Sequence, residues 1–233
     1  MQGVFITGTS TEVGKTFVGV ALARALNQRN VNVIPRKPIE SGCFKCDGEL
    51  IPQDALALQE AAEYPGRLSD VCPYRFEPPI SPVRAAHLAN QVLTTEQLVN
   101  ICLRGSEEGF LLVEGAGGFY SPLAENGLNA DLAVALQLPV LLVADDKLGT
   151  LSQVLLNVEA IQMRGLPLAG VVLNTMNEEQ NDYMDNTADL RERISCPVYS
   201  NPYLPEGDAQ LSETLIESLI NDPGSNKPLR AVR

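Results

Sequence analysis

The sequence predicts an α/β fold: a P-loop NTPase-like three-layer sandwich, in which a mostly parallel sheet carries helices on both faces. Three observations predict it. Short strands are apolar on both faces, as in sheets that are covered on both sides. Segments with helical spacing separate these strands. A glycine-bounded loop, Gly8–Thr16, follows the first apolar strand and ends in Gly-Lys-Thr where a helix begins, which is the layout of a phosphate-binding loop.

The predicted strands are short apolar runs bounded by turn residues. Phe110–Glu114 is strongly apolar, and Pro139–Ala144 is typical of a buried strand. In chain order the predicted strands are Gly3–Thr7, Val31–Pro35, Phe110–Glu114, Pro139–Ala144, Leu168–Leu173 and Pro197–Tyr199. The predicted helices carry apolar residues at helical spacing between these runs. They are Lys15–Gln28, Pro52–Glu63, Pro82–Ala89, a helix ending near Arg104, Asn129–Leu136, Leu151–Arg164, Glu178–Ile194 and Leu211–Ile220.

Two helix boundaries have signals of their own. Thr94 and Gln97 have the spacing of a capping box and mark the start of the helix that ends near Arg104. Gly165 ends the helix that begins at Leu151. No repeat, linker or break in composition interrupts the pattern. We therefore expect a single domain over residues 1–222 and a flexible tail over residues 223–233.

Composition excludes several classes of protein. The 233 residues are 45% hydrophobic and 20% charged, which fits a globular domain with a sizeable core. The formal net charge of −12 argues against a nucleic-acid partner, because phosphate backbones need basic patches. No secretory signal and no apolar run of membrane-spanning length is visible. We expect a cytoplasmic protein with no membrane partner.

Cysteine and histidine usage points away from zinc and away from histidine-based catalysis. Cys43 and Cys46 form a C-x-x-C pair, but a structural zinc site needs two further ligands and His87 is the only histidine. One histidine without a companion motif also disfavours a nucleophilic triad. An odd count of five cysteines without secretory features predicts free thiols in a reducing compartment.

Candidate functional residues gather where the predicted strands end. Ligands of parallel sheets bind beyond the carboxyl ends of the strands. The segments at those ends are Gly8–Thr16, Lys37–Ser41, Glu114–Gly118, Asp145–Gly149 and Asn174. Lys15 supplies a point charge for the outer phosphates and Thr16 a hydroxyl for Mg²⁺. A carboxylate at the end of an apolar strand, as at Glu114, serves Mg²⁺ in such proteins. Taken alone, Lys37 is better explained as an exposed lysine, but its position beside the phosphate-binding loop favours a functional role. Asp54 could simply favour the N-terminal end of its helix.

Six motifs in order resemble the dethiobiotin synthetase family. They are Thr-Glu-Val-Gly-Lys-Thr after Gly8, Lys-Pro-Ile-Glu-Ser-Gly at 37–42, Asp-Ala-Leu-Ala-Leu-Gln at 54–59, Pro-x-Ser-Pro at 79–82, Val-Glu-Gly-Ala-Gly-Gly at 113–118 and Lys-Leu-Gly at 147–149. The resemblance runs from about residue 3 to residue 204. Five residues separate Gly8 from Gly14, one more than the standard loop allows, and this spacing is usual in that family.

The resemblance implies an ATP-dependent cyclo-ligase of biotin synthesis. One amine of 7,8-diaminononanoate takes up CO₂ as a carbamate, and ATP phosphorylates the carbamate to a carbamic-phosphoric anhydride. The second amine then closes the ureido ring and releases phosphate. ATP is the co-substrate and Mg²⁺ the cofactor. Members are usually homodimers with sites near the interface, so a homodimer is implied here too.

The resemblance also implies roles for individual residues. The catalytic group would be Lys37, Lys15 and Thr11, and the Mg²⁺ ligands Thr16, Asp54 and Glu114. Nucleotide and metal would be bound by Glu12, Val13, Gly14, Lys15, Thr16, Phe17, Asp54, Glu114, Gly115, Ala116, Gly117, Asn174, Thr175, Pro202, Tyr203 and Leu204. The diamine and its carbamate would meet Ser41, Thr11, Glu12, Gly117, Gly118 and Lys147, with Tyr183 reaching the carboxylate of the partner's substrate.

Two other functions fit parts of the sequence. A partitioning or positioning switch ATPase shares the phosphate-binding loop, but its loop normally carries a lysine near the start, and Gly8-Thr9-Ser10 has none. The acidic last helix is also unsuited to anionic lipid. The second alternative is a related cyclo-ligase or amidotransferase synthetase that acts on a larger acid. A chain of this length has no room for the glutaminase module of an amidotransferase. A third alternative, a nucleotide-binding protein of unspecified function, is possible only if the order of the six motifs arose by chance.

Overall fold

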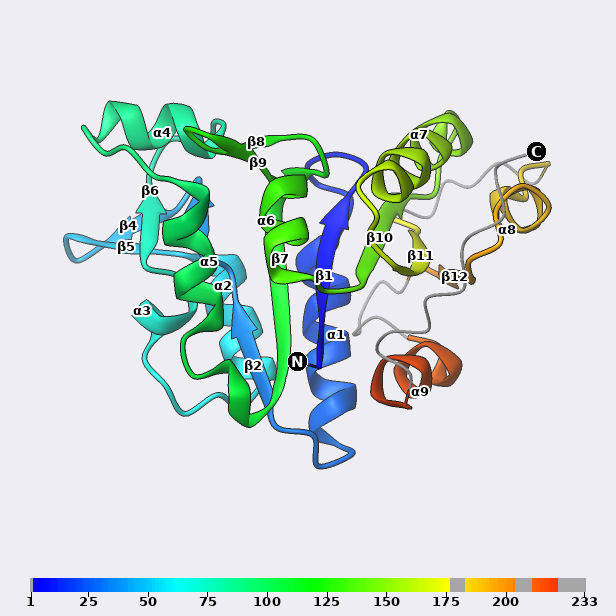
Figure 1. The fold of residues 1–233 in the computed structure, drawn as a ribbon, viewed down its shortest axis with the longest axis horizontal. Helices are drawn as coiled ribbons and strands as arrows, with labels where there is room; N and C mark the ends of the chain where they lie inside the picture. The colour runs from blue at the N-terminus through cyan, green and yellow to red at the C-terminus, as the bar shows by residue number, and fades with distance from the viewer. Residues whose placement is uncertain (1, 177–182, 204–210, 222–233) are drawn as a thin grey trace.

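A six-stranded sheet forms the centre of the molecule in the computed structural model, which describes residues 2–176, 183–203 and 211–221 (Figure 1). Its strand order is β12-β11-β10-β1-β7-β2 and every neighbouring pair is parallel, which confirms the predicted parallel sheet. The strands are β1 (Gly3–Gly8), β2 (Val33–Arg36), β7 (Phe110–Gly118), β10 (Val140–Asp145), β11 (Leu168–Asn174) and β12 (Val198–Asn201).

Helices cover both faces of this sheet, and each face has its own hydrophobic core. Side chains of a strand alternate between the cores: Val4 and Ile6 of β1 belong to one, and Phe5 to the other. The Val4 face packs on α1 (Lys15–Asn27), α2 (Gln53–Ala61) and α9 (Glu213–Asn221). The Phe5 face packs on α4 (Pro82–Leu88), α5 (Thr95–Leu103), α6 (Asn129–Leu136), α7 (Thr150–Met163) and α8 (Asn186–Arg191).

Short elements between β2 and α6 complete the fold. They are β3 (Ile39–Ser41), β4 (Phe44–Cys46), β5 (Glu49–Ile51), α3 (Leu68–Val71), β6 (Tyr74–Phe76), a 3₁₀ turn at Ser106–Glu108, β8 (Pro122–Ala124) and β9 (Gly127–Leu128). β3 pairs with β6, and β4–β5 and β8–β9 are hairpins. The sequence analysis missed all of them, because pieces of two to four residues are too short to show a period.

The predicted strands and helices of the sandwich are confirmed to within a few residues, with one error. The predicted helix Glu178–Ile194 is wrong in its extent. Tyr183 lies in a turn, and α8 begins only at Asn186, where the Asp185 carboxylate accepts the backbone N–H of Ala188 at 2.9 Å. This cap fixes the start of the helix. The polar composition of residues 178–194 gave no sign of where the helix begins. Residues 177–182 and the predicted tail, 223–233, lie outside the described residues.

No helix within the described ranges is long and apolar enough to cross a membrane. All five cysteines fall in these ranges and are free thiols, of which Cys46 alone is exposed. Cys43 is buried, so the two members of the C-x-x-C pair lie in different environments. Within the same ranges, no group of three or more His, Cys, Asp or Glu side chains is arranged to hold a metal ion.

The thiols give a first testable prediction. Burial raises the pKa of Cys43 to about 11 and the pKa of both Cys102 and Cys196 to about 12. Because the thiolate is the reactive form, a brief maleimide treatment of the native protein should label Cys46 and leave the four buried thiols unmodified. Mass spectrometry counts the labels. The Cys46→Ser variant should take up no label, and rapid labelling of that variant would show that the buried thiols are accessible.

Candidate active site

The loop between β1 and α1 forms the floor of the site. Gly14 is the N-cap of α1 with φ of 86°, in the left-handed region that favours glycine. A Cβ at this position would lie 2.0 Å from Asn174 Nδ2, so no side chain fits there. Lys15 folds back over the loop, where its Nζ donates to the Ser10 carbonyl at 3.1 Å. Burial lowers the pKa of this lysine, and the loop thus presents a poorly solvated cation at a helix N-terminus.

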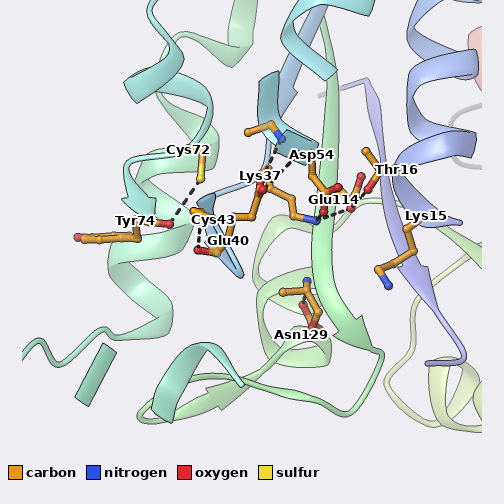
Figure 2. Close-up of polar contacts among 12 residues, drawn as sticks. Lys15, Thr16, Lys37, Glu40, Cys43, Asp54, Cys72, Tyr74, Glu114 and Asn129 are labelled. Carbon is orange, nitrogen blue, oxygen red and sulfur yellow. Dashed lines mark hydrogen bonds and ion pairs between the residues drawn. The ribbon is translucent and has the colours of Figure 1, made fainter. Parts of the chain in front are cut away.

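Four side chains from separate elements meet beside this loop (Figure 2). Lys37 follows β2, Asp54 lies in the first turn of α2, and Glu114 lies in β7, in register with Ile6 of the adjacent β1. The Lys37 Nζ contacts Asp54 Oδ2 at 2.8 Å and also Glu114 Oε1. The Thr16 hydroxyl donates to the same Glu114 oxygen at 2.9 Å. The carboxyl end of the sheet therefore brings Thr16, Lys37, Asp54 and Glu114 into one cluster.

The charges of this cluster stabilise one another. Burial lowers the pKa of Lys37, but the carboxylates of Glu114, Asp54 and Glu40 outweigh it and hold that pKa above its ordinary value. Burial raises the pKa of Asp54, and Lys37 more than offsets this, so the pKa is lowered. Lys37 is thus an ammonium at neutral pH. It can stabilise negative charge on a substrate, but it is not suited to accept a proton.

One buried atom of the cluster has no partner. Glu114 is 1% exposed, and its Oε2 makes no hydrogen bond within the described residues. An unpaired carboxylate oxygen is costly in such a place. Glu114, Asp54 and the Thr16 hydroxyl are hard oxygen donors beside a phosphate-binding loop, which is the donor set that Mg²⁺ prefers. The residues therefore fit a magnesium ion whose other ligands come from phosphate and water.

Sequence reasoning missed Glu40, which lies next to the cluster. Its Oε1 accepts the backbone N–H of Asp54 at 3.1 Å and its Oε2 that of Ala55 at 3.0 Å. Burial raises the pKa of Glu40 to about 7, although Lys37 opposes the shift. The motif at 37–42 contained the residue, but the sequence does not show that its carboxylate reaches the backbone of Asp54, 14 residues further along the chain.

The glycine-rich end of β7 is held by a second residue that the sequence analysis missed. Asn129 is fully buried; its amide donates to the carbonyls of Ala116 at 2.6 Å and Gly118 at 2.9 Å, and its oxygen accepts the Ala116 N–H at 3.1 Å. Gly117 takes a φ of 79°, and a Cβ on it would lie 3.8 Å from a methyl of Thr11. This places the loop after Glu114 against the phosphate-binding loop.

We expect the Asn129→Ala variant to lose the fixed shape of this loop. Three hydrogen bonds to Ala116 and Gly118 would be absent, so groups that contact substrate would be misplaced. Turnover should fall about ten- to a hundredfold, with the dissociation constant for nucleotide nearly unchanged. Steady-state kinetics and nucleotide titration measure the two effects. Asn32→Ala, which removes an exposed asparagine, is the control; equal losses in both variants would count against a positioning role for Asn129.

Asn174, predicted to bind the base, lies at the end of β11 behind the loop. Its Nδ2 donates to the Val13 carbonyl at 3.2 Å, and its Oδ1 accepts from Asn201 Nδ2 at 2.6 Å. Asn201, at the end of β12, is a third residue that sequence reasoning missed. Thr175 is buried beside this pair, its N–H donating to the Asn201 carbonyl at 3.0 Å. The amide of Asn174 is thus oriented before any ligand binds.

Comparison with known proteins decides the family. A family model described as "AAA domain" matches residues 2–208. The ATP-dependent dethiobiotin synthetase of Ruthia magnifica is 37% identical over 218 residues, which cover 93% of this chain and 99% of that protein. That of Cellvibrio japonicus is 39% identical over 197 residues, or 84% of this chain and 86% of that one.

The chain belongs to the ATP-dependent dethiobiotin synthetase family. The resemblance inferred from six motifs is thereby confirmed, and the family is one of P-loop ATP-dependent ligases. The fold also matches solved P-loop proteins. The septum site-determining protein MinD of Pyrococcus horikoshii gives a TM-score of 0.55 at 15% identity, covering 88% of this chain and 83% of that one. At that identity, the likeness extends to the fold alone.

The site residues predicted from the dethiobiotin synthetase resemblance do not all lie in one place. The loop, cluster and glycine residues come together, as described above. Ser41 lies at the end of β3, where its hydroxyl donates to the Ile80 carbonyl at 2.7 Å. Four predicted residues are exposed: Glu12 in the phosphate-binding loop, Phe17 just after it, and Pro202 and Tyr203 after β12. Leu204 lies outside the described residues.

Lys147 and Tyr183 do not join the cluster. Lys147 is exposed and forms an ion pair with Asp145 at 2.7 Å, while Tyr183 is 98% exposed. Both belong to the surface around the start of α7 and α8. A substrate role for either residue therefore depends on a molecule that lies against this surface.

Proposed function

We propose that this chain is a dethiobiotin synthetase that carboxylates 7,8-diaminononanoate with CO₂ and closes the ring at the expense of ATP. Family membership supports the activity. The observation that carries it is the convergence of Lys37, Asp54, Glu114 and the phosphate-binding loop, since it combines a fixed cation with a metal-ligand set beside a phosphate site. The products would be dethiobiotin, ADP and phosphate.

The chemistry needs charge stabilisation rather than strong acids or bases. One amine nitrogen bonds to the carbon of CO₂ and loses a proton, which gives a carbamate. A carbamate oxygen then attacks the γ-phosphorus, and the bond to ADP breaks. Finally, the second amine attacks the carbonyl carbon and inorganic phosphate leaves. Each step keeps negative charge on oxygen, so the ammonium groups of Lys37 and Lys15 would supply most of the stabilisation.

The remaining residues would position the reactants. Thr11 and Gly117, which face each other across the two loops, would enclose the carbamate, with Ser41 and Gly118 at the side of the amines. Asn174 would present its preset amide to the base of ATP. Thr16, Asp54 and Glu114 would hold Mg²⁺, which neutralises phosphate charge and orients the γ-phosphoryl group when it is bound.

A homodimer is a further part of the proposal. Three large apolar side chains on and just before α7 are strongly exposed: Leu148 at 92%, Leu156 at 65% and Met163 at 78%. Leu156 and Met163 lie two helical turns apart and share one face. A partner on this face would cover them and would place Tyr183 near the substrate that the partner binds, while Lys147 would contact the substrate of its own chain. Light scattering measures the molecular mass in solution. A monomer at the concentration used for assays would refute the proposed homodimer.

Two further parts remain proposals. One is a cytoplasmic location, which the free thiols favour because reducing compartments keep cysteines unpaired. The other is a single domain over residues 1–222. The hydrophobic contacts of α9 with the face of the sheet that carries Val4 support it, since they link residues far apart in the chain.

The dependence of ADP release on substrate tests the proposed function. A ligase should release ADP only when diamine, bicarbonate and Mg²⁺ are all present, whereas a partitioning-type switch ATPase hydrolyses ATP without a diamine. Phosphate release measured with each component omitted in turn separates the two. Turnover that ignores the diamine would favour the switch ATPase and refute the ligase.

A further inference from the structure

Glu40 is a buried carboxylate that the proposed reaction does not use. It is 6% exposed and lies in β3, three residues after Lys37. Both of its oxygens accept backbone N–H groups, from Asp54 at 3.1 Å and from Ala55 at 3.0 Å. Figure 2 shows the side chain on the far side of Lys37 from the phosphate-binding loop. Since a carboxylate is costly in such a place unless it is hydrogen-bonded, its position is tied to these two N–H groups.

Helix α2 needs this acceptor, because it has no cap of its own. Its N-cap residue is Pro52, which has no side-chain acceptor, so the first N–H groups of the helix lack a local partner. Glu40 supplies both acceptor atoms from another segment, and its ionised form faces the positive end of the helix dipole. The capped turn is the one that carries Asp54, so the cap also fixes the backbone of a candidate metal ligand.

Two links join the segment 37–40 to this turn. The first is the contact of Lys37 with the Asp54 carboxylate at 2.8 Å, which involves a group that phosphate and carbamate would also attract. The second is the pair of backbone bonds from Glu40, which involves no reacting group. The second link can therefore persist while Lys37 interacts with substrate. It would keep the start of α2, and with it Asp54, in place at that stage.

We propose that Glu40 is a positioning residue for the metal site: it caps α2 from β3 and so holds Asp54 in place to bind Mg²⁺ with Glu114. The inference rests on the proposed Mg²⁺- and ATP-dependent function. Partners that orient a metal ligand typically change metal affinity ten- to a hundredfold when they are removed. A residue with a merely structural role would lower thermal stability and leave metal affinity unchanged.

The test compares Glu40→Ala, Glu40→Gln and the control Thr94→Ala with the wild type. Thr94 is the local N-cap of α5, where its hydroxyl accepts the Gln97 N–H, and it lies outside the site. Mn²⁺ affinity is measured by electron paramagnetic resonance in the presence of a non-hydrolysable ATP analogue, and the unfolding temperature by calorimetry. We expect Glu40→Ala to weaken Mn²⁺ binding about tenfold or more. Glu40→Gln, which keeps one carbonyl acceptor, should show a smaller loss. Thr94→Ala should lower only the unfolding temperature.

Wild-type Mn²⁺ affinity in both Glu40 variants would overturn the proposal, whatever happens to their stability. If Glu40→Ala does not fold, Glu40→Gln decides by the same criterion, with a loss of at least threefold expected and wild-type affinity as the contradiction. Failure of the proposed function is a separate result: the wild type would form no cyclic urea. The Mn²⁺ titrations on the same proteins would still decide the role of Glu40.

Discussion

Replacing Lys37 with glutamine is expected to lower turnover at least about a hundredfold, because the variant lacks a preset cation beside the developing negative charges. Lys37 is 3% exposed and contacts both Asp54 and Glu114, so water cannot easily replace its charge. The affinity for ATP should change little, since the phosphate-binding loop and Lys15 remain in place. Steady-state assays give the turnover number, and equilibrium titration gives nucleotide affinity.

The control for this substitution is Lys45→Gln, which removes an exposed lysine of β4. It loses the same charge from the same part of the chain and should keep wild-type turnover. The Lys37 variant should also be less stable, because two carboxylates would lose the buried cation that they share. Assays therefore belong well below its unfolding temperature. Turnover equal to that of the Lys45 variant would refute the role of Lys37.

The second large effect is expected for Glu114→Gln. Glutamine has nearly the same shape but supplies a neutral oxygen in place of a carboxylate, and Mg²⁺ binds anionic oxygen more strongly. Because Glu114 also accepts the Thr16 hydroxyl, its loss affects two candidate ligands together. The Mg²⁺ concentration for half-maximal activity should rise about tenfold or more, and maximal turnover should fall. Activity assays across a Mg²⁺ series measure both quantities.

Glu125→Gln provides the matched control for Glu114. Glu125 is an acidic residue whose carboxylate faces His87 on the surface at 2.6 Å, away from the candidate ligands. This variant should retain the wild-type Mg²⁺ dependence. A Glu114 variant with the same Mg²⁺ curve as the Glu125 variant would exclude Glu114 as a metal ligand.

The sequence predicts those parts of the site whose signals are local. The phosphate-binding loop is contiguous, so Gly14, Lys15 and Thr16 are recognisable from their order alone. Glu114 stands out because a carboxylate directly follows the apolar run 110–113, within a strand that continues to Gly118. The central sheet follows from the continuous apolar runs of its inner strands, β1, β7 and β10. These features can be recognised without knowing which segments of the chain contact one another in the fold.

The parts that the sequence did not predict depend on contacts between segments. Glu40 reaches the Asp54 backbone from 14 residues away, and Asn201 reaches Asn174 from 27 residues away. Asn129 reads as an ordinary helix-start residue, although its amide fixes the backbone of Ala116 and Gly118. A buried polar side chain that satisfies backbone groups elsewhere leaves no periodic pattern in the sequence. Only the packed structure identifies its partners.

The proposed reaction itself is tested most directly by its product. The purified protein is incubated with 7,8-diaminononanoate, isotopically labelled bicarbonate, Mg²⁺ and ATP, and the organic product is analysed by mass spectrometry. We predict a cyclic urea that contains one labelled carbon and is heavier than the diamine by one carbon dioxide less one water, formed in equal amount with ADP. ADP without any labelled cyclic product would contradict the account.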